Sequence, residues 1–117
     1  MSGFTEQQIK DTLEIVESSI ISCERVQPKL KDGSASLTIN RNRIKALYIS
    51  KDLLMNKEIH YSKEELAKAI TQITSIKNKS TTGINNAKKG TATFTRFLKI
   101  ITAMNVLLEY LQRAMVK

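Results

Sequence analysis

The chain has 117 residues, a formal net charge of +8 and 41% hydrophobic residues. This length fits one domain, residues 1–117, and excludes a second independent core. One proline and four glycines argue against disorder and against a β-rich scaffold, so we expect an all-α protein.

Three features predict a cytoplasmic protein without a membrane span. The single cysteine, Cys23, cannot form an internal disulfide. The first residues lack the basic and apolar segments of a signal peptide. The most apolar stretch, residues 97–111, contains Lys99 and Glu109 and is shorter than the roughly 20 residues that cross a bilayer.

The two halves of the chain resemble each other at a shift of 57 residues. Residues 4–54 align with residues 61–111 without a gap, with eight identical pairs in 51 positions, where about three are expected from composition. The pairs are Ser18/Ser75, Lys31/Lys88, Gly33/Gly90, Ala35/Ala92, Thr38/Thr95, Ile44/Ile101, Ala46/Ala103 and Leu54/Leu111. We interpret this as two tandem-repeated helical hairpins.

Both halves carry the same helix start signal. Thr5 is followed three residues later by Gln8, and Ser62 by Glu65, the spacing of a capping box. The sequence therefore predicts helices that begin at Thr5 and Ser62.

Apolar residues then recur with helical spacing. In the first helix they are Ile9, Leu13, Val16, Ile20 and Cys23; in the third, Leu66, Ile70 and Ile73. In the second they are Leu37, Ile44, Leu47, Tyr48, Leu54 and Met55; in the fourth, Phe94, Phe97, Ile101, Met104, Leu108, Leu111 and Met115. Lys77 and Ser80 occupy the places equivalent to Ile20 and Cys23, so the buried stripe of the third helix turns or ends there.

The helix ends are marked by different residues in the two halves. Pro28 predicts that the first helix stops or kinks near this residue. Gly83, with Asn85 and Asn86, predicts a weakened end of the third helix at the matching place.

Gly33 and Gly90 predict the turns within the hairpins, and residues 56–60 predict the link between them. These elements favour an antiparallel up-down-up-down four-helix bundle with pseudo-twofold symmetry. A domain-swapped or paired dimer of hairpins is the alternative, so the protein is expected to be a monomer or a homodimer.

In such a bundle the first and third loops lie at the same end, which predicts one basic site for an anion. The candidate residues are Lys29, Lys31, Ser34, Ser36, Arg41, Arg43, Lys88, Lys89, Thr91, Thr93 and Arg96, with Arg25, Lys77, Lys79 and Lys99 nearby. Helix N-termini and hydroxyl groups favour phosphate. A structural role is the other interpretation, because glycine followed by Ser or Thr is common in helix-to-helix turns.

Catalytic chemistry is not supported by the sequence. No Walker-type spacing follows Gly33 or Gly90. His60 stands alone in the predicted link, and Cys23 lies on an apolar stripe. We therefore expect a protein that is not an enzyme and has no metal site and no cofactor.

Two functions fit these features. The first is a non-catalytic intracellular regulator or adaptor whose basic loop end binds an anionic partner, most simply nucleic acid through its phosphates, with Tyr110 as the best exposed aromatic residue for stacking. The alternative is a protein-binding bundle of the immunity, antitoxin or assembly-factor type, with a groove near Ile76 to Ile84. Small bacteriocin immunity proteins are similar in size, charge and helical plan, although no motif residues carry that comparison.

Overall fold

The structure is a computed structural model that describes residues 3–117. Within these residues the regular secondary structure is all helical. The helices are α1 (Glu6–Val26), α2 (Ala35–Leu54), α3 (Lys63–Asn86) and α4 (Ala92–Met115), with a short 3₁₀ turn, η1, at Gln27–Lys29. The prediction of an all-α protein with four helices is confirmed.

The predicted helix starts are confirmed at the level of hydrogen bonds. Thr5 and Ser62 are the N-caps of α1 and α3, and each forms a complete capping box. The backbone N–H of Gln8 donates to Thr5 Oγ1 at 3.0 Å, and that of Glu65 donates to Ser62 Oγ at 3.0 Å. Two of the free donors in each first turn are satisfied in this way.

Both predicted helix ends agree with the structure. α1 ends at Val26 and passes into η1 at Pro28. α3 ends at Asn86, the last residue of the predicted end, and Gly83 lies within its last turn. Gly83 allows a close helix contact there, because a Cβ at this position would lie 2.5 Å from Cζ of Phe97 on α4.

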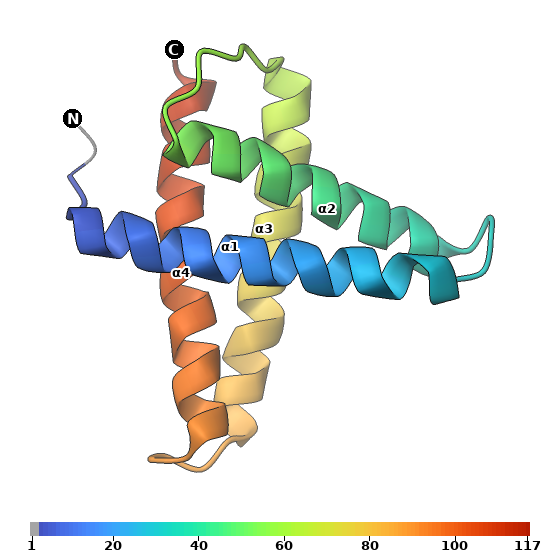
Figure 1. The fold of residues 1–117 in the computed structure, drawn as a ribbon, viewed down its shortest axis with the longest axis vertical. Helices are drawn as coiled ribbons and strands as arrows, with labels where there is room; N and C mark the ends of the chain where they lie inside the picture. The colour runs from blue at the N-terminus through green and yellow to red at the C-terminus, as the bar shows by residue number, and fades with distance from the viewer. Residues whose placement is uncertain (1–2) are drawn as a thin grey trace.

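The two hairpins cross, which corrects the predicted up-down-up-down bundle (Figure 1). The α1–α2 hairpin lies across the α3–α4 hairpin, and the molecule measures 40 × 39 × 20 Å. A bundle of helices with 20 to 24 residues would have one long axis of about 30 to 36 Å and two short ones. Two long dimensions and one short one instead describe two layers of crossed helix pairs.

The core lies where the hairpins cross. Fully buried side chains come from every helix, including Val16 of α1, Leu47 of α2, Ile73 of α3 and Leu107 of α4. The main apolar cluster does not extend along the arms, because the apolar stripes do not continue along the helices; Leu37 of α2 is buried apart from this cluster. Lys77 follows Ile73 on α3, and Ile21 and Val26 of α1 are about half exposed, at 54% and 44%.

Two residues of the predicted apolar stripe of α2, Tyr48 and Met55, are exposed and not buried. Tyr48 is 42% exposed and its hydroxyl donates to Glu24 Oε2 at 3.3 Å, and Met55, 49% exposed, is the C-cap of α2. The connection that follows agrees with the predicted link at residues 56–60, and Asn56 adopts a positive φ of 54° just after the helix.

Candidate nucleic-acid interface

The turn between α1 and α2 is built around Gly33. Its φ of 75° is unfavourable for a residue with a side chain, and the backbone N–H of Ser34 donates to the carbonyl of Lys31 at 3.1 Å. The hydroxyl of Ser34 accepts from the N–H of Leu37 at 3.2 Å, so it caps α2.

The turn between α3 and α4 repeats this geometry with the equivalent residues. Gly90 has a φ of 85°, and the N–H of Thr91 donates to the carbonyl of Lys88 at 3.2 Å. The hydroxyl of Thr91 accepts from the N–H of Phe94 at 3.2 Å and donates to the Lys88 carbonyl at 2.7 Å. The hydroxyls of Ser34 and Thr91 therefore cap α2 and α4, which agrees with a structural role for these residues.

The crossed fold separates the two halves of the predicted basic site. One glycine turn ends the α1–α2 hairpin and the other ends the α3–α4 hairpin, and these ends point in different directions (Figure 1). The first arm carries Lys29, Lys31, Ser34, Ser36, Arg41 and Arg43; the second carries Lys88, Lys89, Thr91, Thr93 and Arg96. The expectation of one basic pole is wrong, because it depended on α1 and α3 running in parallel.

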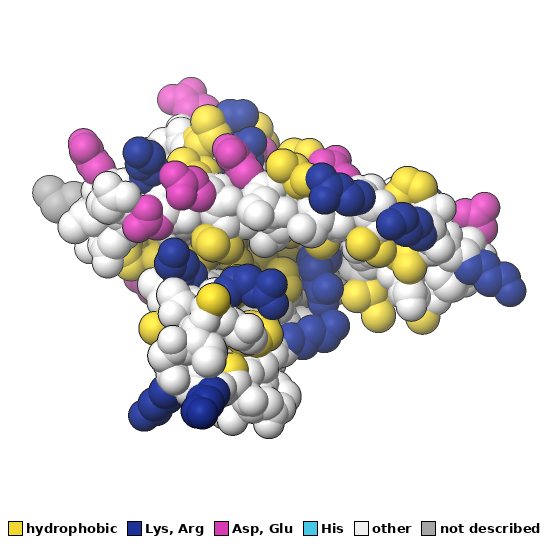
Figure 2. All heavy atoms as spheres, turned by 60° about the horizontal axis from the view of Figure 1, so that its bottom comes forward, with side chains coloured by type: hydrophobic (Ala, Val, Ile, Leu, Met, Phe, Trp, Pro, Cys, Tyr) yellow, Lys and Arg dark blue, Asp and Glu magenta, His cyan; other side chains and the backbone are white. Residues whose placement is uncertain are grey.

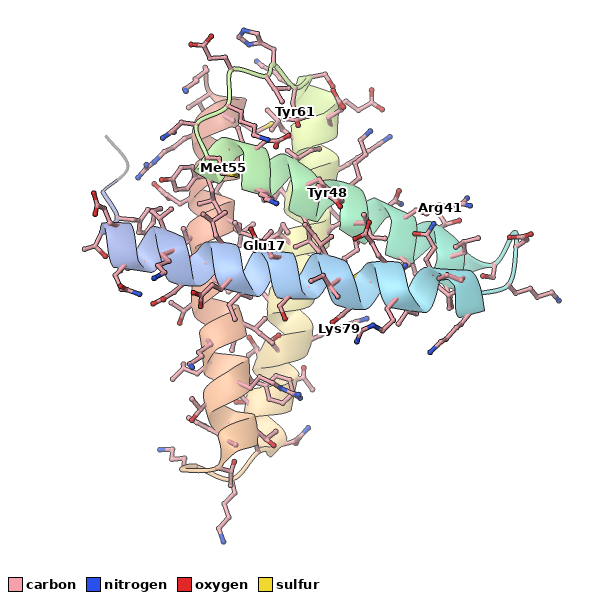
Figure 3. The ribbon with its side chains drawn as sticks, in the orientation of Figure 1. Glu17, Arg41, Tyr48, Met55, Tyr61 and Lys79 are labelled. Carbon is pink, nitrogen blue, oxygen red and sulfur yellow. The ribbon has the colours of Figure 1, made fainter. Side chains whose placement is uncertain are left out.

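The α1–α2 arm, residues 21–43, has mixed charge. Its five Lys and Arg residues are accompanied by Glu24 and Asp32. Arg41 is exposed near the outer end of α2 (Figure 3), where it lines a shallow hollow together with Glu24 and Asp32. This arm therefore offers a weaker positive field than its count of basic residues suggests.

Arg43 of the predicted set is turned inward. Its Nε and one terminal nitrogen are buried without a hydrogen-bond partner within the described residues. Arg43 lies near Cys23 of α1. Burial raises the pKa of the Cys23 thiol, and the positive charge of Arg43 opposes this rise. Arg43 thus belongs to the hairpin interior rather than to a surface that could contact phosphate.

The α3–α4 arm, residues 77–99, is the strongly basic part of the molecule. It contains six Lys and Arg residues and no Asp or Glu; the nearest acids along the chain are Glu65 and Glu109. The six are Lys77, Lys79, Lys88, Lys89, Arg96 and Lys99, all of them exposed except Lys77, which is half-buried. In Figure 2 this arm projects toward the viewer with Lys and Arg on its surface, whereas Asp and Glu gather over the other hairpin.

None of these six residues is neutralised by an ion pair. The ion pairs found within residues 3–117 involve Lys45, Lys51, Lys57, Lys68 and Arg113, all outside the arm. Lys79 emerges from α3 into the corner below α1, so the positive surface reaches from the tip of the arm to the crossing (Figure 3). The site prediction placed Lys77, Lys79 and Lys99 only nearby; the absence of acids between Glu65 and Glu109 was the signal that could have included them.

The aromatic residues of the arm are used for packing. The Phe97 ring lies against Gly83, and the guanidinium of Arg96 lies 5.4 Å from the centre of that ring. Phe94 is half-buried. Tyr110, the residue predicted for stacking, is half-buried near the other end of α4 and stacks on Phe4 at 6.0 Å. The arm therefore offers cations and hydroxyls, but no free ring for a base.

Within residues 3–117, no group of three or more His, Cys, Asp or Glu side chains is arranged to hold a metal ion. None of the described helices combines the length and apolar character that a bilayer span requires. Comparisons with known protein families, characterised proteins and solved structures found no match to this chain.

Proposed function

We propose that this protein is a non-catalytic cytoplasmic regulator or adaptor that binds nucleic acid through the phosphate backbone, using the α3–α4 arm. The observation that carries the proposal is the run of residues 66–108, which contains seven Lys and Arg residues and no acid. Six of these residues belong to an arm that extends beyond the crossing. Unpaired cations on a protruding element attract a polyanion by releasing its condensed counterions.

The chemistry of the arm predicts how it binds. Lysine offers a point charge to phosphate, and the exposed asparagines that separate the cations supply hydrogen-bond donors. Contacts of this kind position a protein on the backbone and carry no direct base information. The binding should therefore be weakly selective for sequence and strongly dependent on salt.

The packed aromatic rings favour double-stranded over single-stranded nucleic acid. Proteins that hold single strands rely on stacking of bases on aromatic side chains, worth about 1–3 kcal/mol per base. With Phe97 covered by Arg96, the arm lacks this contribution. A duplex presents a denser array of phosphates and needs no stacking.

Fluorescence anisotropy with a labelled duplex of about 20 base pairs, and with one of its strands, tests the proposal. The arm variant replaces Lys79, Lys88 and Lys89 with Ala. The matched control replaces Lys29, Lys31 and Arg41 with Ala, which removes the same charge from exposed positions on the other arm. We expect the arm variant to lose about tenfold or more in affinity. The slope of its log affinity against log salt concentration should fall by the equivalent of about two to three phosphate contacts. The control should lose less than about threefold in affinity.

Equal losses in the two variants would show that net charge acts without a site. Duplex binding that changes little between about 50 and 200 mM salt would contradict a phosphate-backbone mechanism. Circular dichroism of each variant verifies that the helices are retained.

A further inference from the structure

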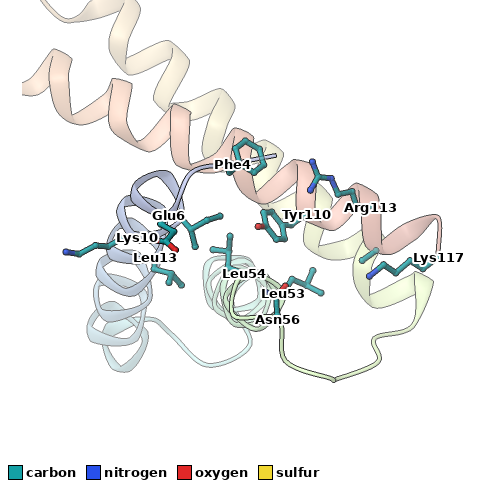
Figure 4. A pocket seen from close by; sticks show the side chains of 12 residues that line it. Phe4, Glu6, Lys10, Leu13, Leu53, Leu54, Asn56, Tyr110, Arg113 and Lys117 are labelled. Carbon is teal, nitrogen blue, oxygen red and sulfur yellow. The ribbon is translucent and has the colours of Figure 1, made fainter. Parts of the chain in front are cut away.

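A hollow outside the basic arm lies where three helix ends meet. It is formed by the start of α1, the end of α2 and the end of α4, and has a volume of about 650 Å³ (Figure 4). Its floor is apolar and includes Ile9, Leu13, Leu53, Leu54 and Ala114. We call this hollow and its continuation, described below, the trough.

One wall of the trough is an ordered group of rings and a cation. Phe4 and Tyr110 stack at 6.0 Å with an angle of 21° between their planes. The guanidinium of Arg113 lies 5.7 Å from the centre of each ring, and its Nε donates to Glu109 Oε1 at 3.1 Å. Arg113 is thereby held in place at the edge of the apolar floor, which lowers the entropy cost of pairing it with an anion.

The charges around the trough are mostly positive. Lys10, Arg113 and Lys117 line the first hollow, against one acid, Glu6, and Arg113 is also paired with Glu109. The continuation adds Lys57 and Lys63 against Glu58. Lys10 and Lys117 are exposed and form no ion pair within the described residues. An apolar floor with cations at its rim is complementary to a ligand with an apolar face and acidic flanks.

The shape of the trough favours an elongated ligand. A second hollow of about 690 Å³ follows the link between the hairpins and shares Leu53, Asn56, Ala114 and Lys117 with the first. Ile59, which is 46% exposed, lines this continuation. Small ligands are usually enclosed over most of their surface. An open channel that continues from one hollow to the next, with both apolar and charged residues along it, instead suits an amphipathic helix.

We infer that the trough binds a short acidic amphipathic helix of a partner protein. The apolar face of that helix lies on Ile9, Leu13 and Leu53, and its carboxylates pair with Lys10 and Lys117 beside the guanidinium of Arg113. This site is separate from the α3–α4 arm, so it does not depend on the function proposed for the arm. The groove predicted near Ile76 to Ile84 offers no comparable floor, because the hollow on the adjoining surface of α3, from Ile70 to Thr82, has Ile70 as its only apolar lining residue.

The test uses two synthetic fluorescent peptides of about 14 residues, a length of roughly four helical turns. Both carry Leu at helical spacing on an alanine framework, and they differ only in having Glu or Lys at the flanking positions. The protein carries Lys79→Ala, Lys88→Ala and Lys89→Ala, so that the basic arm does not attract the acidic peptide. We expect the Glu peptide to bind at least about tenfold more tightly than the Lys peptide.

Charge reversal then locates the site. In the same background, Lys10→Glu with Lys117→Glu should reverse the preference, so that the Lys peptide binds better. A matched reversal at Lys29 and Lys31, on the α1–α2 arm, should leave the preference unchanged. Amide chemical shifts in the NMR spectrum should change around Leu13, Leu53 and Ala114 when the Glu peptide is added.

Several results would overturn the inference. Equal affinity for the two peptides, or a preference that survives the reversal at Lys10 and Lys117, would exclude charge-guided docking in the trough. If a fatty acid, added below its critical micelle concentration, changes the chemical shifts of these amides and the Glu peptide does not, the trough binds a small amphiphile instead of a helix. If the chemical shifts of these amides instead change with protein concentration as the protein dimerises, and no peptide binds, the trough is occupied by a second copy of the chain.

Discussion

Phe97 of α4 lies directly over Gly83 of α3, with its Cζ 2.5 Å from the position that a Cβ at Gly83 would take. The two helices therefore approach closely within the basic arm. Their contact covers part of the ring, which is half-buried.

This contact makes Gly83→Ala an informative substitution. In an ordinary helix the change stabilises by up to about 1 kcal/mol, because alanine has the higher helix propensity. Here the ring must move, and we expect a net loss of about 1 kcal/mol in the free energy of unfolding, measured with urea. In a Phe97→Ala background the same change should instead stabilise the protein. Stabilisation by Gly83→Ala in the wild-type chain would show that the ring moves aside without cost.

Tyr61 and Asp52 connect the link to α2 through a hydrogen bond of 2.5 Å, donated by the Tyr61 hydroxyl. Burial raises the pKa of Tyr61 from its ordinary value of 10 to about 12, with further contributions from the hydrogen bond to Asp52 and from its charge. Because the pKa is higher in the folded state, the neutral phenol stabilises the fold below pH 10, and this contribution is lost as the pH rises through 12.

Ultraviolet titration should show one tyrosine that ionises near pH 12 and disappears in Tyr61→Phe. Asp52→Asn should bring this titration to lower pH. Between pH 10 and 12 the stability of the wild-type protein should fall more than that of Tyr61→Phe. Equal slopes for the two proteins would contradict the assignment.

The two capping boxes predict different responses to acid. The pKa of Glu65 is lowered, first by the hydrogen bond from the backbone N–H of Ser62 and also by Lys45, whereas Gln8 in the equivalent box does not titrate. A lowered folded pKa means that the contribution of Glu65 is present above its ordinary value of 4.5 and is lost as the pH falls through the folded value. Glu65→Gln should make stability less dependent on pH in this range, as followed by thermal unfolding. Gln8→Glu should add a dependence of the same sign.

Removing either cap itself should weaken the fold by a similar amount. Thr5→Ala and Ser62→Ala should each lower the free energy of unfolding by about 1 kcal/mol, within a range of about 0.5–2. Ser18→Ala, at an exposed position within α1, is the matched control with a change near zero. Losses at Thr5 and Ser62 no larger than the control would show that the caps do not contribute in solution.

The core at the crossing should make the two hairpins unfold together. Leu107 is completely buried, and Leu107→Ala should cost about 2–5 kcal/mol. Leu98, on the same helix but 48% exposed, should cost far less. Fluorescence and circular dichroism should report one transition in both variants, whereas separate transitions would show that each hairpin is stable by itself.

The local elements were predictable because their signals are local. The capping boxes at Thr5 and Ser62 and the turns at Gly33 and Gly90 involve groups no more than four residues apart, so neighbouring residues suffice to specify them. The end of α3 at Asn86 followed the same rule, because Gly83, Asn85 and Asn86 mark it in the sequence. The sequence did not show that Gly83 faces Phe97, 14 residues away along the chain, because this contact is between two helices.

The sequence by itself determined four helices, two hairpins and a long stretch without acids, all of which depend on residue type and short-range spacing. Only the tertiary structure decided that the hairpins cross, and with that which basic residues share a surface. Helical periodicity defines an apolar face but not the angle at which two faces meet, because that angle follows from how side chains such as Val16, Ile73 and Met104 interlock across the interface. The predicted basic end was therefore divided between two arms, of which the α3–α4 arm is free of acids.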